Sequence, residues 1–90
     1  MKHISIHVYG NVQGVFFRAH ARELAQQLGI TGFARNTREG SLHIEAEGDE
    51  RSLEELVQWC HQGPPAARVS GVNVQEGKLE GSSEFVIRHD

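Results

Sequence analysis

The stretch from His3 to Leu28, HISIHVYGNVQGVFFRAHARELAQQL, changes its hydrophobic period once, and this change decides the fold. In residues 3–9 apolar and polar side chains alternate, which predicts a half-buried strand. A loop over residues 10–14, with a glycine at each end, interrupts the alternation. From about Phe17 onwards the apolar residues recur at helical spacing: Ala21, Leu24, Ala25 and Leu28. The chain therefore opens with a strand, a glycine loop and an amphipathic helix that Gly29 is suited to end.

A pair of strands is predicted after this helix. The pair covers residues 32–38 and 41–47, with a short turn at Glu39-Gly40 between its members. Alternation in the second strand predicts one apolar face and one outward, polar face. The residues on the outward face are Ser41, His43, Glu45 and Glu47.

A second amphipathic helix is predicted between Gly48-Asp49 and Gly63-Pro64-Pro65. Asp49 suits the N-cap, and Glu50 in the first turn suits the helix dipole. The two prolines end the helix because proline removes a backbone donor and restricts the residue before it. The apolar stripe of this helix consists of Leu53, Leu56, Val57 and Cys60.

Two more strands complete the chain, one over residues 68–76 with a bulge near Gly71 and a short one over residues 84–88. The order β-α-β-β-α-β plus a terminal strand predicts an α+β fold, the ferredoxin-like split βαβ sandwich. Such a fold has one mostly antiparallel sheet with two helices on one face. With 90 residues, we expect residues 1–90 to form a single domain.

Composition and charge exclude several classes of protein. No apolar run approaches the roughly 18 residues of a membrane span, and residues 1–6 alternate instead of forming the apolar core of a signal peptide. A single cysteine allows neither an internal disulfide nor a multi-cysteine zinc site, so we expect a cytoplasmic protein. The net charge of −3 divides into +3 over residues 1–40 and −6 over residues 41–90. An acidic domain is a poor general binder of nucleic acid.

The segment GNVQGVFFR over residues 10–18 is the strongest candidate for chemistry. It joins a strand to a helix, so backbone N–H groups can converge there beside the positive end of the helix dipole. Arg18 adds a planar guanidinium that matches a phosphate or carboxylate. The Gly-Lys-Ser/Thr ending of a nucleotide-binding P-loop is missing. These residues by themselves fit an anion site, and they equally fit an ordinary strand-to-helix turn followed by a surface arginine.

Two motifs resemble those of the acylphosphatase family. Residues 10–18 match the pattern of glycine, any residue, Val-Gln-Gly-Val, any residue, an aromatic residue and arginine. Residues 32–42, GFARNTREGSL, match a second block of glycine, an aromatic, a small and a basic residue and asparagine, with a glycine four residues after the asparagine. Leu42 stands where the family often has valine, a difference that concerns packing. The resemblance covers essentially the whole chain.

The resemblance implies hydrolysis of the carboxyl–phosphate bond of a small acyl phosphate, without a metal or cofactor. By position, Arg18 corresponds to the family's phosphate-binding arginine, and Asn36 to its water-orienting asparagine. The family's phosphate-binding loop corresponds to the backbone amides of Gln13, Gly14, Val15, Phe16 and Phe17.

Other classes of function compete with hydrolysis. A non-catalytic module that binds phosphate or carbamoyl phosphate would have the same fold. RNA binding on the open sheet is disfavoured by the acidic outward face of residues 41–47, and a copper chaperone would need two cysteines. We expect a monomer with no nucleic-acid or membrane partner.

The remaining candidates are interpreted as structural. We expect the six histidines to face solvent, His20 among them on the first helix. Phe17 and Cys60 are expected to be buried, and Trp59 to lie at the edge of the core. Phe16 is placed at the mouth of the site or in the core. The arginines at 22, 35 and 38 are interpreted as surface charges that can steer anions.

Overall fold

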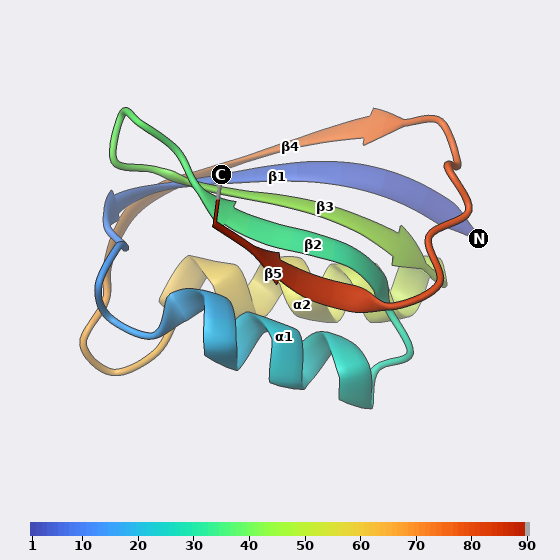
Figure 1. The fold of residues 1–90 in the computed structure, drawn as a ribbon, viewed down its shortest axis with the longest axis horizontal. Helices are drawn as coiled ribbons and strands as arrows, with labels where there is room; N and C mark the ends of the chain where they lie inside the picture. The colour runs from blue at the N-terminus through green and yellow to red at the C-terminus, as the bar shows by residue number, and fades with distance from the viewer. Residues whose placement is uncertain (90) are drawn as a thin grey trace.

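The structure, a computed structural model, describes residues 1–89. One layer is a five-stranded sheet with the order β4-β1-β3-β2-β5, and the second layer is a pair of helices that covers one face of it (Figure 1). The elements are β1 Lys2–Asn11, α1 Phe17–Gln27, β2 Thr31–Asn36, β3 Leu42–Gly48, α2 Glu50–Gln62, β4 Arg68–Gly77 and β5 Phe85–Arg88. No helix within the described part of the chain is both long and apolar enough to span a membrane.

The strand pairing confirms the predicted fold class. Strand β1 pairs antiparallel with β3 and β4, and β2 pairs antiparallel with β3; only the β2–β5 pair is parallel. The predicted bulge near Gly71 is also confirmed, because the β1–β4 register shifts between Tyr9, opposite Gly71, and Gly10, opposite Val69.

The predicted helix ends agree with the structure in position. Gly29, with φ of 71°, follows the C-cap of α1, and Gly63, also with φ of 71°, ends α2 ahead of the two prolines. Asp49 occupies the N-cap of α2, but its side chain makes no capping hydrogen bond. The start of α2 therefore relies on packing and on Glu50 in the first turn.

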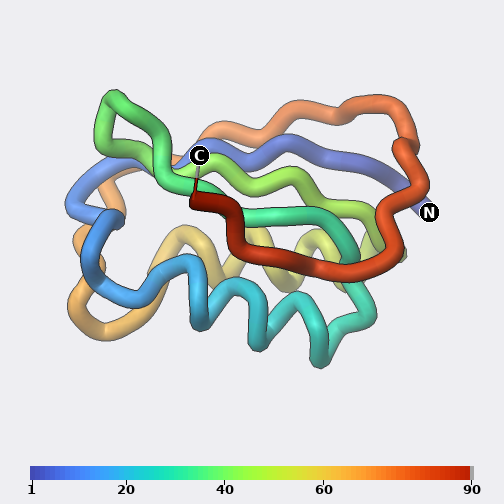
Figure 2. The backbone as a smooth tube through the Cα atoms, in the orientation of Figure 1, coloured from blue at the N-terminus to red at the C-terminus, as the bar shows by residue number. Residues whose placement is uncertain are grey.

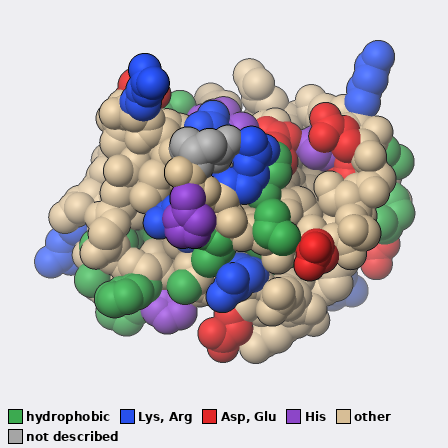
Figure 3. Space-filling view, viewed as in Figure 1, with side chains coloured by type: hydrophobic (Ala, Val, Ile, Leu, Met, Phe, Trp, Pro, Cys, Tyr) green, Lys and Arg blue, Asp and Glu red, His purple; other side chains and the backbone are tan. Residues whose placement is uncertain are grey.

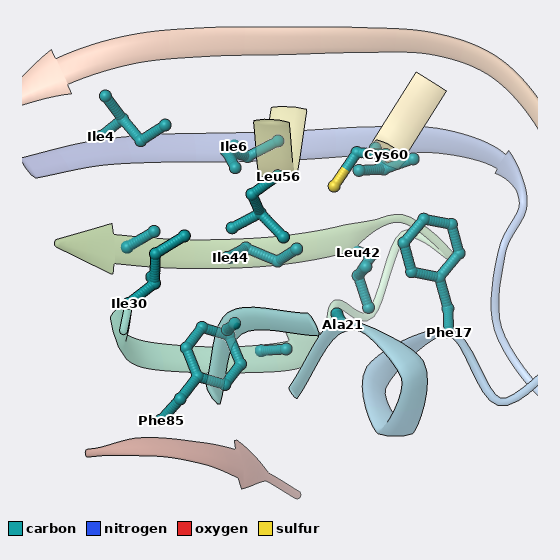
Figure 4. Close-up of a cluster of buried hydrophobic side chains, with 14 of the residues drawn as sticks. Ile4, Ile6, Phe17, Ala21, Ile30, Leu42, Ile44, Leu56, Cys60 and Phe85 are labelled. Atoms are coloured by element: carbon teal, nitrogen blue, oxygen red, sulfur yellow. The ribbon is translucent and has the colours of Figure 1, made fainter. Parts of the chain in front are cut away.

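The core lies between the sheet and the two helices. In β1, Ile4, Ile6 and Val8 face the helices and are buried, as the alternation predicts. Phe17 and Cys60 reach the same core from α1 and α2 (Figure 4). The Phe17 ring meets Trp59 edge-on at 5.1 Å between centroids, which places Trp59 at the edge of the core as expected.

Three residues that the sequence interpretation places on the outward face of the sheet are buried: Ser41, whose hydroxyl contacts Thr37 in the turn after β2, and the pair His3 and Glu47. His3 is only 4% exposed and Glu47 only 3% exposed, although alternation places both away from the helices. The two side chains contact each other, and the backbone of residues 80–82 binds Glu47. The prediction that all six histidines face solvent is therefore wrong for His3, because its ring is enclosed by Glu45, Glu47 and the backbone of Gly77 on β4.

Gly32 is expected to be the least replaceable glycine in the sheet. Its φ is 138°, and a Cβ there would lie 1.9 Å from the carbonyl oxygen of Glu45 on β3. We expect Gly32→Ala to lower the free energy of unfolding by about 2–4 kcal/mol, because both the backbone and the neighbouring strand must shift. Gly81→Ala is the matched control, since φ there is 77° but the Cβ would meet nothing within 4 Å. Equal losses for the two variants in urea denaturation would contradict the steric argument.

The topology brings the carboxyl ends of three strands together at one end of the sheet. Strands β1, β2 and β5 run in the same direction, so their carboxyl ends lie together beside the loop that enters α1 (Figure 2). The residues placed there include both motifs identified in the sequence.

Candidate active site

The loop between β1 and α1 contains two residues in the left-handed backbone conformation. Gly14 has φ of 73°, and Phe16 has φ of 65°, the only positive φ of a non-glycine residue within residues 1–89. A left-handed residue of this kind costs about 1 kcal/mol or more, so the surrounding structure must hold it in place. Phe16 is the N-cap of α1, where no side chain caps the helix and no acidic residue stands in the first turn. Neither the N-cap nor the first turn of α1 therefore supplies an anion to the positive end of the helix dipole.

Gln13 ties this loop to the turn that follows β2. Its side-chain nitrogen donates to the carbonyl oxygens of Thr37 and Ser41, at 2.8 and 2.9 Å. The turn is itself braced, because the Thr37 and Ser41 hydroxyls lie 2.6 Å apart and the backbone N–H of Thr37 donates to the Ser41 carbonyl. The Gln13 side chain thus connects the two motifs, and only its backbone amide is left as a candidate anion donor.

Arg18 lies in the first turn of α1 and reaches across to the carboxyl end of β5. Its Nη1 donates to the Arg88 carbonyl oxygen at 2.9 Å and lies 3.4 Å from Nδ1 of His89. These contacts orient the guanidinium at the open end of the sheet. Figure 3 shows Lys or Arg and His side chains gathered on the surface around this end of the molecule.

Asn36 is the last residue of β2 and faces the helix side of the sheet. It follows Arg35, which pairs with Arg88 across the parallel β2–β5 ladder. Asn36 and His89 are therefore the next positions along two neighbouring parallel strands. This register brings Asn36 to the same edge as Arg18.

One cavity brings the two motifs together. It has a volume of about 270 Å³ and lies between the loop, the start of α1 and the ends of β2 and β5. Its lining consists of Val12, Gly14, Phe16, Phe17, Arg18, Ala19, Asn36, Ile87 and His89. Of the predicted site residues, Arg18, Asn36, Gly14, Phe16 and Phe17 line this cavity; Gln13 and Val15 belong to its loop without lining it. Phe16 stands at the rim, 75% exposed, whereas the Phe17 side chain is buried.

A larger groove elsewhere is less suited to an anion. It has a volume of about 680 Å³ and runs between α2 and the end of β4. Glu50, Glu54 and Glu76 line it, and the cation Lys2 lies close to two of them, 3.1 Å from Glu50 and 3.8 Å from Glu76. Three carboxylates would repel a phosphate group, so the smaller cavity at the motifs is the better candidate.

Sequence reasoning missed the contribution of β5 to the cavity. Ile87 and His89 line it, and the Arg88 carbonyl binds Arg18. The alternation of residues 84–88 predicts the face of Ile87, but no local signal places this strand beside β2. His89 falls outside the predicted strand and lacked any motif of its own.

The other candidate residues have structural partners. Arg35 donates from Nε to Nδ1 of His43 at 3.0 Å, and His43 stacks on His7 with 4.5 Å between ring centroids. His20 lies on the exposed side of α1. Within residues 1–89, no three His, Cys, Asp or Glu side chains are grouped so that they can hold a metal ion.

A cluster of carboxylates and histidines lies on the open face of the sheet, at the end opposite the cavity. His3 Nε2 lies 2.5 Å from Glu45 and His3 Nδ1 lies 2.8 Å from Glu47. Burial alone would lower the pKa of His3, but the hydrogen bonds to these two carboxylates outweigh it and raise the pKa. Burial likewise opposes ionisation of Glu45, yet hydrogen bonds from Ser5, His3 and His43 leave its pKa lowered. Backbone N–H groups, first that of Glu80, together with His3 lower the pKa of Glu47.

His3→Gln is expected to change how stability depends on pH. Because the pKa of His3 is raised in the folded protein, its stabilising effect is complete below the ordinary value of 6.5 and is lost as the pH rises through the folded value. The difference in free energy of unfolding between wild type and His3→Gln should therefore be largest below pH 6.5 and shrink at higher pH. Urea denaturation at a series of pH values measures it, with exposed His61→Gln as the control. A difference that grows with pH would contradict the sign.

Comparison with known proteins decides the family. The sequence model of the family described as acylphosphatase matches residues 4–87. This chain belongs to the acylphosphatase family. An acylphosphatase of Rubrobacter xylanophilus is 46% identical over 88 residues, which cover 97% of this chain and 80% of the relative. An acylphosphatase of Methylococcus capsulatus is 44% identical and covers 100% of this chain and 99% of its own length.

A solved acylphosphatase structure shows the same architecture. The crystal structure of the acylphosphatase from Bacillus subtilis superimposes with a TM-score of 0.95 at 35% identity, covering 98% of this chain and 99% of that one. The ferredoxin-like arrangement predicted from the sequence is thus that of the acylphosphatase family.

Proposed function

We propose that this protein is an acylphosphatase that hydrolyses the carboxyl–phosphate bond of small acyl phosphates at the cavity between the α1 loop and β5. The observation that carries the proposal is the meeting of Arg18, Asn36 and the glycine loop around one cavity. Arg18 and Asn36 lie 18 residues apart in the sequence and belong to different motifs, which the Gln13 side chain links.

The phosphate group binds between the loop and Arg18. Backbone N–H groups of Gln13, Gly14, Val15, Phe16 and Phe17 surround the phosphate oxygens, and the helix dipole adds to their attraction. The Arg18 guanidinium donates two parallel hydrogen bonds to a phosphate oxygen pair. Phe16, which is exposed at the rim, and the apolar lining residue Ile87 suit the acyl group, while the negative phosphate lies deeper.

Asn36 orients the attacking water. Its amide oxygen accepts a hydrogen bond from the water, and its NH₂ group donates to a negatively charged oxygen. An amide cannot take up the proton at neutral pH, so Asn36 positions the nucleophile without acting as a base. The turn that follows Asn36 is held by the contact between the Thr37 and Ser41 hydroxyls. This fits the role of Asn36, because orienting a water requires a side chain with few accessible conformations.

The chemical step balances without a metal or a cofactor. The water oxygen forms a bond to phosphorus as the bond from phosphorus to the acyl oxygen breaks, and that electron pair leaves on the carboxylate. One water proton moves to a phosphate oxygen, which makes the step substrate-assisted. Because a carboxylate is a weakly basic leaving group, it needs no proton, and catalysis consists of positioning and charge stabilisation.

The proposal extends to the domain organisation, the location and the oligomeric state of the enzyme. We propose a single domain over residues 1–90 that works as a cytoplasmic monomer on a small-molecule substrate. Burial raises the pKa of the Cys60 thiol to about 12, so this cysteine is an inert part of the core and no nucleophile. The acidic carboxyl-terminal half disfavours nucleic-acid and membrane surfaces.

Hydrolysis of acetyl phosphate and benzoyl phosphate in the presence of EDTA tests the proposal. We expect turnover of both substrates, with inorganic phosphate released in equal amount to the carboxylate. Binding of phosphate without turnover of either substrate would contradict the enzyme and favour a non-catalytic module that binds phosphate or carbamoyl phosphate.

A further inference from the structure

Glu47 is a buried carboxylate that has no part in the proposed reaction. It is the penultimate residue of β3, on the open face of the sheet at the end away from the cavity, and is 3% exposed. His3 Nδ1 lies 2.8 Å from one carboxylate oxygen, which also accepts from the backbone N–H of Glu80. The backbone N–H groups of Gly81 and Ser82 donate to the other oxygen at 3.0 and 3.3 Å. A buried carboxylate with four donors is a strong anchor, because losing any partner leaves a buried charge undersatisfied.

The anchored segment spans the whole width of the sheet. Residues 78–84 leave β4 at one edge and deliver the chain to β5 at the other edge, passing the ends of β1, β3 and β2 (Figures 1 and 2). The segment contains no helix or strand of its own. Glu47 stands on the central strand β3 and therefore holds this crossing near its middle. We call residues 78–84 the crossing segment.

Strand β5 depends on the crossing segment for its position. It has four residues, pairs only with β2 in the sheet order, and buries only the side chain of Phe85 among its residues. The backbone N–H of Gly32 donates to the Glu84 carbonyl at 2.9 Å, which fixes the point where the crossing segment joins β5. The Arg88 guanidinium lies 4.5 Å from the centre of the Phe33 ring and helps to hold the carboxyl end of β5. The amino end of this short edge strand depends on Phe85 and on the crossing segment, so loosening that segment can shift the strand.

The far end of β5 holds the phosphate-binding arginine. The Arg88 carbonyl accepts from Arg18 at 2.9 Å, and Ile87 and His89 line the cavity. A shift of β5 along or away from β2 therefore moves the acceptor of Arg18 and two walls of the cavity together.

From this connection we propose that Glu47 is a positioning residue for Arg18, which acts by fixing the crossing segment and, through it, the register and seating of β5. The proposal rests on the proposed role of Arg18 in holding phosphate. Glu47 does not contact the substrate, and His3 supports it by filling the remaining acceptor capacity of the carboxylate.

A double-mutant cycle on phosphate affinity tests the proposal. The probe is inorganic phosphate, titrated into wild type, Glu47→Gln, Arg18→Ala and the double variant, with the dissociation constant read from amide chemical shifts. We expect Glu47→Gln to weaken phosphate binding about threefold to tenfold in the wild-type background. In the Arg18→Ala background the same change should have a smaller effect, because the group that Glu47 positions is gone and only the cavity walls formed by β5 still shift.

Several controls separate positioning from general destabilisation. Glu76→Gln removes a carboxylate that is largely exposed and should leave phosphate affinity unchanged. Hydrogen exchange should show loss of protection at residues 80–82 and along β5 in Glu47→Gln. Glu47→Asp keeps the negative charge but shortens the side chain by one methylene group, so we expect an intermediate loss of phosphate affinity. If Glu47→Gln does not fold, the double-mutant cycle is measured with Glu47→Asp instead.

Three outcomes would overturn the proposal. The first is an equal loss of affinity in both backgrounds, which would make the effect of Glu47 independent of Arg18. The second is wild-type affinity in Glu47→Gln while residues 80–82 exchange freely, which would make the anchor purely structural and leave the phosphate site standing. The third is the absence of phosphate binding in wild type, which would contradict the proposed phosphate site as well.

Discussion

Arg18→Ala is expected to lower kcat/KM for acetyl phosphate by about 10³-fold or more while the protein stays folded. The guanidinium supplies the one side-chain cation proposed to contact phosphate, and its charge-assisted hydrogen bonds strengthen as negative charge concentrates on the transferring group. Its partners in the structure are at the cavity surface, so its loss should cost little stability. Steady-state hydrolysis with EDTA present measures the effect, and circular dichroism checks the fold.

Arg22→Ala is the matched control for Arg18. Arg22 lies one helical turn further along α1, is exposed, and does not line the cavity. We expect its removal to change kcat/KM by no more than a few fold, through weaker steering of the anionic substrate. If Arg18→Ala retained activity within tenfold of wild type, or if the two arginines had equal effects, the assigned phosphate site would be wrong.

Asn36→Ala is expected to lower kcat by about 10²–10³-fold with little change in KM, because Asn36 is proposed to act on the water and not on the bound phosphate. Asn36→Asp should fall in the same range: it keeps a water acceptor but adds a negative charge beside the phosphate and removes the NH₂ donor. A rise in KM with unchanged kcat would instead place Asn36 in substrate binding.

A control on the sheet distinguishes the chemistry of Asn36 from loss of structure. Asn73→Ala removes an exposed asparagine from β4, an edge strand away from the cavity. Activity of this variant should equal that of wild type. Full activity in Asn36→Ala would leave the fold assignment standing and remove the water-orienting role.

The parts of the fold that depend on periodicity could be predicted from the sequence. Alternation in residues 3–9 places Ile4, Ile6 and Val8 against the helices, and the helical stripe brings Cys60 into the core. Glycines with positive φ, such as Gly29 and Gly63, mark the helix ends because few other residues adopt that conformation. The hydrophobic period and the glycines at helix ends depend only on neighbouring residues, so a single sequence is enough to detect them.

The parts that depend on long-range contacts could not be predicted. Residues 78–84 lack a hydrophobic period, so nothing in them indicates that their backbone binds Glu47. The pairing of β5 with β2, which brings His89 into the cavity, likewise depends on how the sheet is assembled. Motif matching pointed to Gln13 as part of the loop, but only the structure shows that its side chain bridges to Thr37.

Hydrolysis of acetyl phosphate in ¹⁸O-labelled water, with EDTA present, tests the central claim most directly. If the bound water attacks phosphorus in the cavity, the wild-type enzyme will place one ¹⁸O atom in inorganic phosphate and none in acetate, as mass spectrometry of the products will show. Label in the acetate, or no turnover of the substrate by folded protein, would contradict the account.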